Sequence, residues 1–479
     1  MKFTILSHAG LSVEHNGVRI VSDPWLIGSC YWRSWWNFPE PPAGLIEKLQ
    51  PDYIYLTHLH WDHFHGALLK KLFDPRTRIL VPKVPTWRML RDLEWLGFCN
   101  VTEVPHGGKV RLGEDFALYS YQFGLGVDSA VVLAAGDHVL FNCNDCKYFG
   151  LPLKQITNRF PKIDFVLRSY SSASAIPYCI ENYETIFPHL RTHNDYVEEF
   201  CRFSLSLPAR YAIPFASNHC FLHKETFHFN QTAVLAEDVR CAYQRLAARM
   251  NHESECVVMA PGSSWSDADG FQVVPFNYAQ RDEYIQEMLV RHEAKLQQQY
   301  EKENHTLADF TSFREYFEAF LRAIPWPVRK CLKSRIVFRT HDAEGEHNWL
   351  VDMASSKVTI LAERANDYVT IETPVNVLND CTKVCMFSVW TASKRLKICL
   401  PSPNALKTVT TLFKLLDFYE LEMLPIGKNF TWRSLSIRLR RWREVVEVCR
   451  LFFKHFVFRR PFKIACLYAL PECREIDAK

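Results

Sequence analysis

Residues 57–65 place four histidines and one aspartate within nine consecutive positions, in the order Thr-His-Leu-His-Trp-Asp-His-Phe-His. They directly follow residues 53–56, an aromatic and β-branched run that is typical of a buried strand. The chain therefore carries a group of candidate metal ligands on a loop at the end of a strand, where loops hold functional side chains on a rigid scaffold. A lone histidine is usually structural, but this spacing predicts a metal site.

The spacing within this loop divides the ligands into two pairs. His58 and His60 are two residues apart, so they can project to one side of the loop and bind one ion. Asp62 and His63 are adjacent and suit a second ion a short distance away. Imidazole and carboxylate together favour Zn, Fe, Mn or Co over Ca or Mg. We therefore expect two divalent metal ions, zinc or iron, with manganese as an alternative.

The length and the local patterns predict several parts. The 479 residues are too many for one compact core. Strand-like and helix-like runs alternate over residues 1–230, which predicts an α/β layered fold for the metal-binding domain. Residues 231–330 are rich in helix-forming residues and are expected to be mostly helical. Residues 331–479 return to strand patterns before a final helix, so we expect a C-terminal α+β domain there.

The last helix is basic and amphipathic. Residues 432–463 hold ten Lys and Arg against two Glu, and their apolar side chains recur at helical spacing. Either the apolar face docks on the domain and the basic face meets solvent, or the helix contacts an anionic membrane surface or a polyanionic substrate. The net charge of the whole chain is only +4, which argues against a nucleic-acid-binding protein.

Cysteine usage and the N-terminal segment indicate a compartment. The 16 cysteines are scattered rather than set in a disulfide framework. Residues 1–8 become polar too early for the core of a signal peptide, and no apolar run approaches the length of about 18 residues that a membrane span needs. We therefore expect a cytoplasmic protein with reduced thiols and no membrane span.

Two further features each have two interpretations. The aromatic segment of residues 31–39 either packs beneath a loop or forms a wall of the substrate pocket. The Cys143-x-x-Cys146 pair either packs as two thiols or binds zinc or exchanges electrons. The spacing alone is a weak signal and no second pair lies nearby, so we expect packing.

The order His-x-His-x-Asp-His after an apolar strand resembles the signature of the metallo-β-lactamase superfamily. Residues 7–10 and 17–25 resemble the opening of the branch that includes lactonase-like enzymes and the hydrolase-like part of CMP-N-acetylneuraminate hydroxylases. The resemblance covers roughly residues 1–225 and implies an α/β fold, namely a metallo-β-lactamase-like αβ/βα sandwich.

The resemblance also implies roles for single residues. Asp23 matches an early aspartate that orients a metal ligand through a hydrogen bond. Asp145, after an apolar strand, matches the aspartate that bridges two metals, and His219 matches the last histidine ligand of the second ion. Asp62 and Asp145 are then the candidate catalytic residues.

One ligand of the family pattern is missing. The family usually has a histidine about twenty residues before the bridging aspartate, and residues 122–129 contain none. Asp128 is the best substitute in that region. A carboxylate there would make the first site richer in oxygen, which favours iron or manganese. His65 has no counterpart in the motif, and we expect it to be a neighbour rather than a ligand.

Three functions follow as hypotheses. The first is a hydrolase whose dinuclear site activates water against an ester, lactone or phosphodiester-type bond of a small or anionic metabolite. The second is an iron-dependent oxygenase acting on a nucleotide sugar or a related metabolite. It would need a separate redox partner, because a Rieske cluster requires a Cys-x-His pair and the sequence has none. The third is a role without catalysis.

Overall fold

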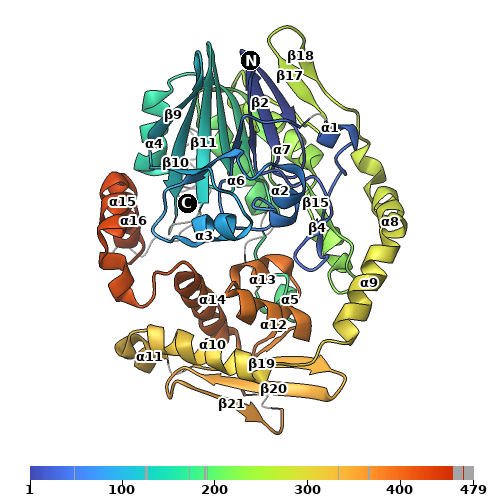
Figure 1. Ribbon diagram of the computed structural model, residues 1–479, viewed down its shortest axis with the longest axis vertical. Coiled ribbons are helices and arrows are strands. Elements are labelled where there is room, and N and C mark those ends of the chain that lie inside the picture. The colour runs from blue at the N-terminus through green and yellow to red at the C-terminus, as the bar shows by residue number, and fades with distance from the viewer. Residues whose placement is uncertain are drawn as a thin grey trace.

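The computed structural model describes residues 1–47, 49–124, 128–171, 173–187, 190, 193–332, 334–364, 367–456 and 468. Two β-sheets lie face to face in the first half of the chain, and helices cover their outer faces (Figure 1). A further sheet with its own helices is built from the last third of the chain. These layers confirm the predicted α/β sandwich.

The first sheet has the strand order β18-β17-β1-β2-β3-β6-β7-β8. Its strands are β1 (Lys2–Ile5), β2 (Leu11–His15), β3 (Val18–Ser22), β6 (Tyr53–Tyr55), β7 (Arg78–Pro82), β8 (Val101–Val104), β17 (Ser264–Ser266) and β18 (Gly270–Gln272). Strands β3, β6, β7 and β8 run parallel, and β1 runs the same way because β2 is antiparallel to both β1 and β3. The carboxyl ends of β1, β3 and β6 therefore lie at one edge of this sheet.

The second sheet has the strand order β16-β14-β13-β12-β11-β10-β9. Its strands are β9 (Gly108–Gly113), β10 (Phe116–Phe123), β11 (Asp128–Ala135), β12 (His138–Asn144), β13 (Ile163–Arg168), β14 (Ala209–Pro214) and β16 (Glu255–Cys256). Strands β12, β13 and β14 are parallel, so their carboxyl ends also share one edge.

The core of the sandwich lies between the two sheets. Apolar side chains from both sheets, including Phe3, Leu118 and Phe165, form one buried cluster there. Neighbouring residues of a strand point to opposite faces, so Tyr55 joins this central cluster while Ile54 packs outwards under helices. Helices α2 (Gly66–Leu72) and α3 (Arg88–Trp95) cover the first sheet, and α4 (Gly150–Arg159), α6 (His193–Leu205) and α7 (Ala236–Arg249) cover the second.

Smaller elements fill the space around the sandwich. A third sheet has the order β15-β5-β4. Its strands and the short helices nearby are β4 (Ser29–Cys30), β5 (Trp35–Asn37), β15 (His219–Phe221), α1 (Gly44–Glu47), α5 (Tyr183–Ile186) and the 3-10 helix η1 (Phe227–Thr232).

The middle of the chain is helical, as predicted, but it also supplies strands to the sandwich. Its later helices are η2 (Tyr278–Gln280), α8 (Arg281–Arg291), α9 (Glu293–Asn304), α10 (Phe310–Ala323) and α11 (Trp326–Leu332). Strands β16, β17 and β18 were not foreseen, because each has two or three residues and shows no alternating pattern of its own. The sheets thus continue beyond residue 230, and the division of the chain at residues 230 and 330 stays a prediction.

The C-terminal sheet has the order β21-β20-β19-β22-β23. Its strands are β19 (Arg335–Asp342), β20 (Gly345–Asp352), β21 (Lys357–Leu361), β22 (Val369–Glu372) and β23 (Lys397–Cys399). The helices of this part are α12 (Val375–Val384), α13 (Ser388–Ser393), η3 (Pro403–Ala405), α14 (Leu406–Glu420) and η4 (Ile426–Phe430). Buried aromatic side chains of α10, the sheet and α13, such as Phe317, Phe338 and Trp390, hold these elements together.

The final basic segment forms two helices, α15 (Trp432–Arg440) and α16 (Trp442–Phe456), and residues 457–463 of the predicted helix lie outside the described residues. The interpretation in which the apolar face docks on the domain is wrong. Arg441 and Glu447 are buried, whereas Trp442 is half exposed and Phe453 is 60% exposed. The physical reason is that the polar side chains have backbone partners on the domain, since Glu447 accepts a hydrogen bond from Leu151 N at 3.2 Å. None of the helices in the described ranges combines the length and the apolar character that a membrane span requires.

A buried ion-pair network joins the C-terminal part to the rest. The fully buried guanidinium of Arg395 donates to Glu303 of α9 at 2.6 Å and to Glu225 at 2.9 Å. Burial alone would raise the pKa of Glu303, but hydrogen bonds from His223 and Arg395 lower it to about 2. The ionised carboxylate therefore stabilises the fold.

Glu303→Gln is expected to lower the free energy of unfolding by about 3 kcal/mol at neutral pH, because it leaves Arg395 with one carboxylate instead of two. The folded-state pKa lies below the ordinary value of 4.5, so the stabilisation is complete above pH 4.5 and is lost as the pH falls towards 2. Urea denaturation at several pH values measures the difference, which should shrink over that window. Glu301→Gln, on the exposed side of the same helix, serves as the control and should change little at any pH. An equal effect of both substitutions would contradict the prediction.

Candidate metal centre

The predicted ligand loop leaves the carboxyl end of β6, and other strand ends meet it. His8 follows β1, Asp23 follows β3 and Asp145 follows β12, so both sheets contribute to one place. All three side chains contact charged or polar side chains of the loop. The edge where the parallel strands end thus carries the candidate site.

The first group of ligand atoms comprises His58, His60 and Asp145, whose ligand atoms all lie within 4.8 Å of one another. His58 Nε2 lies 2.9 Å from His60 Nδ1 and 3.9 Å from Asp145 Oδ2. Burial lowers the pKa of His58 to about 4 and also lowers that of His60. Two neutral imidazoles with facing nitrogens are suitable metal ligands.

The second group comprises His8, Asp62 and His63, all of them buried. Asp62 Oδ2 lies 3.1 Å from His8 Nε2 and 3.3 Å from His63 Nε2. Burial would raise the pKa of Asp62, but His63 and His8 hold it well below its usual range. Burial would lower the pKa of His63, and the surrounding carboxylates, Asp62 first among them, raise it well above its usual range. A cation bound between these side chains would compete with a proton for His63.

Asp145 connects the two groups. Its Oδ2 atom lies 3.9 Å from His58 Nε2 of the first group and 3.4 Å from His63 Nε2 of the second. Burial would raise its pKa, but hydrogen bonding and charge from His63 and His58 lower it, so the group is a carboxylate. One oxygen facing two sets of ligands is the arrangement expected of a bridging ligand.

The donor set fits a pair of divalent metal ions. His63 Nε2 and Asp128 Oδ1 are buried atoms without a hydrogen-bond partner, which is costly unless another group satisfies them. Imidazole and carboxylate in this mixture suit zinc, iron or manganese.

Asp23 supports the second group from behind, as the sequence predicts. Its Oδ2 atom accepts hydrogen bonds from His63 Nδ1 at 2.9 Å and from Thr57 Oγ1 at 2.6 Å. These bonds fix the ring of His63 so that Nε2 points towards Asp62 and Asp145.

Asp128 and His219, which the sequence predicts as ligands, belong to neither group among the described residues. Asp128 lines a cavity together with His58 and His60, and burial raises its pKa. The ring of His219 stacks on Trp35 with a centroid distance of 3.6 Å and lies 5.4 Å from the ring of His8. Their roles as ligands stay predictions.

His8 is the site residue that the sequence analysis did not assign. It stands alone in sequence, 50 residues before His58, and only its place after the first strand could have indicated it. In the structure its Nε2 atom takes the position near Asp62 that was expected of His219.

The aromatic segment of residues 31–39 packs behind the ligands. Tyr31 donates a hydrogen bond to Asp62 Oδ1 and stacks on Trp61. Neither Tyr31 nor Trp35 lines the cavity beside the first group. The packing interpretation therefore holds, with Tyr31 orienting Asp62 as well.

Cys143 and Cys146 are both buried and free, and burial raises the pKa of each thiol well above its usual range. They are not reactive thiolates, which agrees with the interpretation as packed thiols.

The cavity beside the first group has a volume of about 240 Å³. The metal-binding part supplies His58, His60 and Asp128 to one wall. The opposite wall comes from the C-terminal part, namely Met386, Lys414, Asp417, Phe418 and Leu421. Both parts of the chain therefore shape the space above the candidate ligands.

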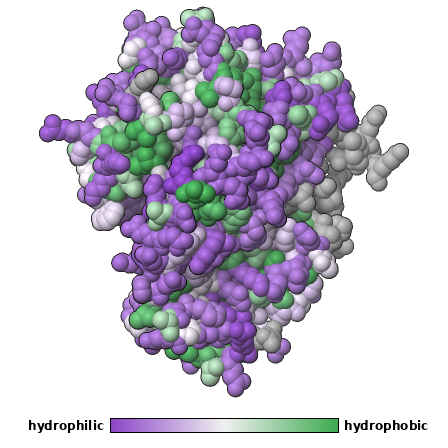
Figure 2. All heavy atoms as spheres, turned by 90° about the vertical axis from the view of Figure 1, so that its right-hand side faces the viewer, coloured by the Kyte–Doolittle hydropathy of each residue, from purple (hydrophilic) through white to green (hydrophobic). Residues whose placement is uncertain are grey.

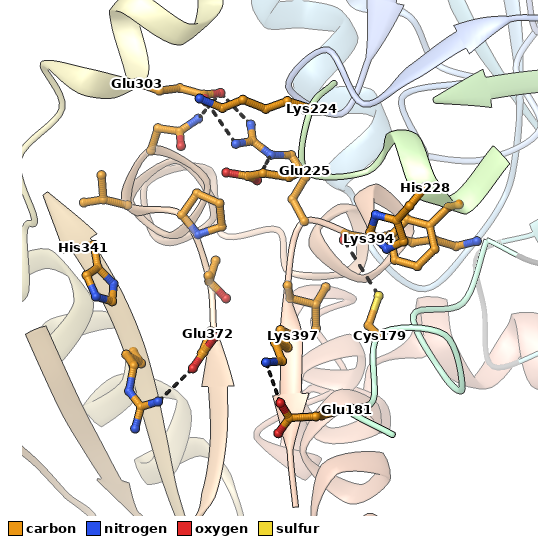
Figure 3. A pocket seen from close by; sticks show the side chains of 18 of the residues that line it. Cys179, Glu181, Lys224, Glu225, His228, Glu303, His341, Glu372, Lys394 and Lys397 are labelled. Atoms are coloured by element: carbon orange, nitrogen blue, oxygen red, sulfur yellow. Dashed lines mark hydrogen bonds and ion pairs between the residues drawn. The ribbon is translucent and has the colours of Figure 1, made fainter. Parts of the chain in front are cut away.

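A larger cavity of about 970 Å³ lies elsewhere, between Tyr178–Asn182 of the sandwich and the C-terminal sheet (Figure 3). Its labelled acids mostly face basic partners, as in Lys397–Glu181 at 2.7 Å and the contact of Arg339 with Glu372 at 2.8 Å. None of the candidate ligands lines it. The smaller cavity is therefore the candidate active site.

This αβ/βα sandwich carries two adjoining groups of histidine and aspartate side chains of the kind that bind metal ions. Residues 2–137 match the family model described as Beta-lactamase superfamily domain. The chain thus contains a β-lactamase superfamily domain.

Relatives match only part of the chain. It is 28% identical over 244 residues to a protein of Mycobacterium tuberculosis named as a Rieske 2Fe-2S iron-sulfur protein. The aligned region covers 48% of this chain and 46% of that protein. It is 30% identical over 152 residues to the cytidine monophosphate-N-acetylneuraminic acid hydroxylase of Mus musculus. The aligned region covers 30% of this chain and 26% of that enzyme. The chain therefore spans less than half the length of these relatives. Among solved structures, an isothiocyanate hydrolase from Delia radicum gut bacteria aligns with a TM-score of 0.41 and 17% sequence identity. The alignment covers 56% of this chain and 99% of that one.

Metal content should separate the two groups of ligands. We expect about two metal ions per chain in the wild type, and about one in His8→Gln or His60→Gln, because each substitution removes a ligand from one group only. Asp145→Asn should lower occupancy at both positions. Elemental analysis of purified protein measures the stoichiometry.

His65→Asn is the control for these variants. His65 lies in the same loop, but its side chain accepts a hydrogen bond from Leu68 N at the start of α2, and asparagine can retain that cap. It should keep both ions. Loss of metal in this variant, with full metal in His8→Gln, would contradict the assignment.

Proposed function

We propose that the chain is a metal-dependent hydrolase with a dinuclear site, acting on an ester, lactone or phosphodiester-type bond. The observation that carries this proposal is that Asp145 Oδ2 faces ligand atoms of both groups, at 3.9 Å and 3.4 Å. A carboxylate shared in this way supports two ions close to each other, which is the arrangement of two-metal hydrolytic sites.

The residues of the chain have distinct tasks in this proposal. Bound at the two groups, divalent ions would supply Lewis acidity and a hydroxide nucleophile near neutral pH. Asp62 and Asp145 hold the negative charge that retains them. Tyr31 and Asp23 fix Asp62 and His63 by hydrogen bonds, so that the ligands need little reorganisation. No serine or cysteine nucleophile is required.

The cavity indicates the kind of substrate. Its volume of about 240 Å³ is below the usual range for a whole drug-sized ligand, so it accepts a small molecule or the reactive end of a longer one. Met386, Phe418 and Leu421 offer apolar contacts, and Lys414 and Asp417 add a basic and an acidic group to the same wall. These features support a substrate with an apolar portion.

Hydrolysis of chromogenic substrates tests the proposal. Zinc-loaded protein should cleave a p-nitrophenyl ester, a lactone or bis(p-nitrophenyl) phosphate, and removal of metal by a chelator should abolish the activity until zinc is restored. Asp145→Asn and Asp62→Asn should each lower kcat by on the order of 100-fold or more, because both hold the ions. His65→Asn should keep the wild-type rate. Activity that survives chelation would refute the proposal.

An iron-dependent oxygenase is the second candidate. Asp128 shares a cavity wall with His58 and His60 and adds a carboxylate to that side, which supports iron or manganese. The similarity to a sialic acid hydroxylase also supports this reading, with a nucleotide sugar or a related metabolite as substrate. The sequence has no Cys-x-His pair, so a Rieske cluster that delivers electrons would have to be held outside these residues.

Protein purified without oxygen decides between these two candidates. Iron as the main metal, with oxygen consumption once a reductant is supplied, would establish the oxygenase. Zinc as the main metal, with hydrolysis, would establish the hydrolase. Less than one metal ion per chain would contradict both.

A further inference from the structure

Helices α15 and α16 carry an apolar face that no described part of the chain covers. We call it the outer face of α15–α16. Its members are exposed by 45% to 79%, and they are Trp432, Leu435, Leu439, Trp442, Val445, Val446, Val448 and Phe453. Both helices lie at the edge of the molecule (Figure 1). Apolar side chains in so large a continuous group usually mark a binding surface.

This face points outwards because contacts on the opposite side of the helices hold them against the rest of the chain. Arg433 of α15 forms an ion pair with Glu103 and stacks over the ring of Trp87 at 3.7 Å. In α16, Glu447 accepts a hydrogen bond from Leu151 N, and Arg441 donates one to Gly124 O. The helices are therefore held by their polar side, and the apolar side chains named above are exposed.

The charges around the outer face have one sign. Arg438, Arg440, Arg450 and Lys454 are exposed. Residues 426–454 contain only two acids, Glu444 and Glu447, and both are turned inwards, with Glu444 paired to Arg441 at 2.7 Å. The face thus combines exposed tryptophan and phenylalanine with exposed arginine and lysine.

We propose that the outer face of α15–α16 docks on the surface of a bilayer that contains anionic phospholipids. Aromatic and aliphatic side chains on one side of a helix, flanked by Lys and Arg, are the features of helices that lie in the membrane interface. The core of a protein–protein interface is by contrast poor in charge. Figure 2 shows the opposite side of the molecule, where hydrophilic residues predominate around several apolar patches.

The docked helices are linked to the candidate site. Arg441 of α16 bonds the backbone of Gly124, four residues before Asp128 of the cavity wall. The polar side of α16 therefore contacts the chain directly after β10, the strand that pairs with β11, which begins at Asp128. The proposal itself does not depend on which reaction the site performs.

Vesicle binding by the full chain tests this proposal. Vesicles of phosphatidylcholine with about one third phosphatidylglycerol should retain the protein in a flotation assay, and pure phosphatidylcholine should retain far less. Raising the salt to about 0.5 M should weaken the binding, because the charged contribution is screened. Trp442→Ser with Phe453→Ser, and separately Arg438→Glu with Arg450→Glu, should each lower the partition coefficient by about 10-fold or more.

Trp326→Ser is the matched control. Trp326 is 63% exposed on α11, outside the outer face, and its loss should leave binding unchanged. All substituted side chains are exposed, and equal melting temperatures would show that the variants are folded. Failure to bind either vesicle, or equal binding by all variants, would overturn the proposal. A dimer in solution that the outer-face variants break, without vesicle binding, would assign the face to a second copy of the chain instead.

Discussion

The buried carboxylate of Asp23 is the interaction on which the site depends. It accepts hydrogen bonds from Thr57 N at 2.8 Å, Thr57 Oγ1 at 2.6 Å, His63 Nδ1 at 2.9 Å and Asn144 Nδ2 at 2.5 Å. These partners follow β6 or end β12, so one side chain joins the ends of strands from both sheets. A carboxylate without exposure is costly to bury unless hydrogen-bond donors satisfy its oxygens. The same bonds set the direction of the ligand loop and the position of the strand that leads to Asp145.

Strained backbone accompanies this interaction. Asp23, Asn144 and Ala216 adopt positive φ angles of 43°, 54° and 47°, and each stands at or just after the end of a strand that points at the site. Such conformations cost on the order of 1–2 kcal/mol for residues other than glycine. They persist because hydrogen bonds hold them, as when Ala216 N donates to His8 O at 2.9 Å. The strain turns the chain sharply at the sheet edge, so that side chains from distant segments converge.

The sequence predicts those features that depend on local pattern. His58, His60, Asp62 and His63 fall within one loop after a strand, so their spacing places them at a strand end, and the resemblance to the metallo-β-lactamase superfamily adds Asp145. His8 could not be found in this way, because its proximity to Asp62 arises from the pairing of β1 through β2 to β3. The sequence also could not predict which side of α16 packs on the domain, because periodicity defines an apolar face but does not show what that face contacts. The backbone partners of Glu447 and Arg441, at Leu151 and Gly124, determine that direction.

The ligands and the substrate space come from different parts of the chain, and this limits what similarity can say. The family match over residues 2–137 includes His8, Asp23, the ligand loop and Asp128, but it ends before Asp145 and before every residue of the opposite cavity wall. Met386, Phe418 and Leu421 belong to the C-terminal part, which the match does not reach. Shared ligands constrain the metal and the class of chemistry, because those depend on donor atoms. Substrate choice depends on the wall that faces them, so this chain can share its metal chemistry with its relatives and still act on a different molecule.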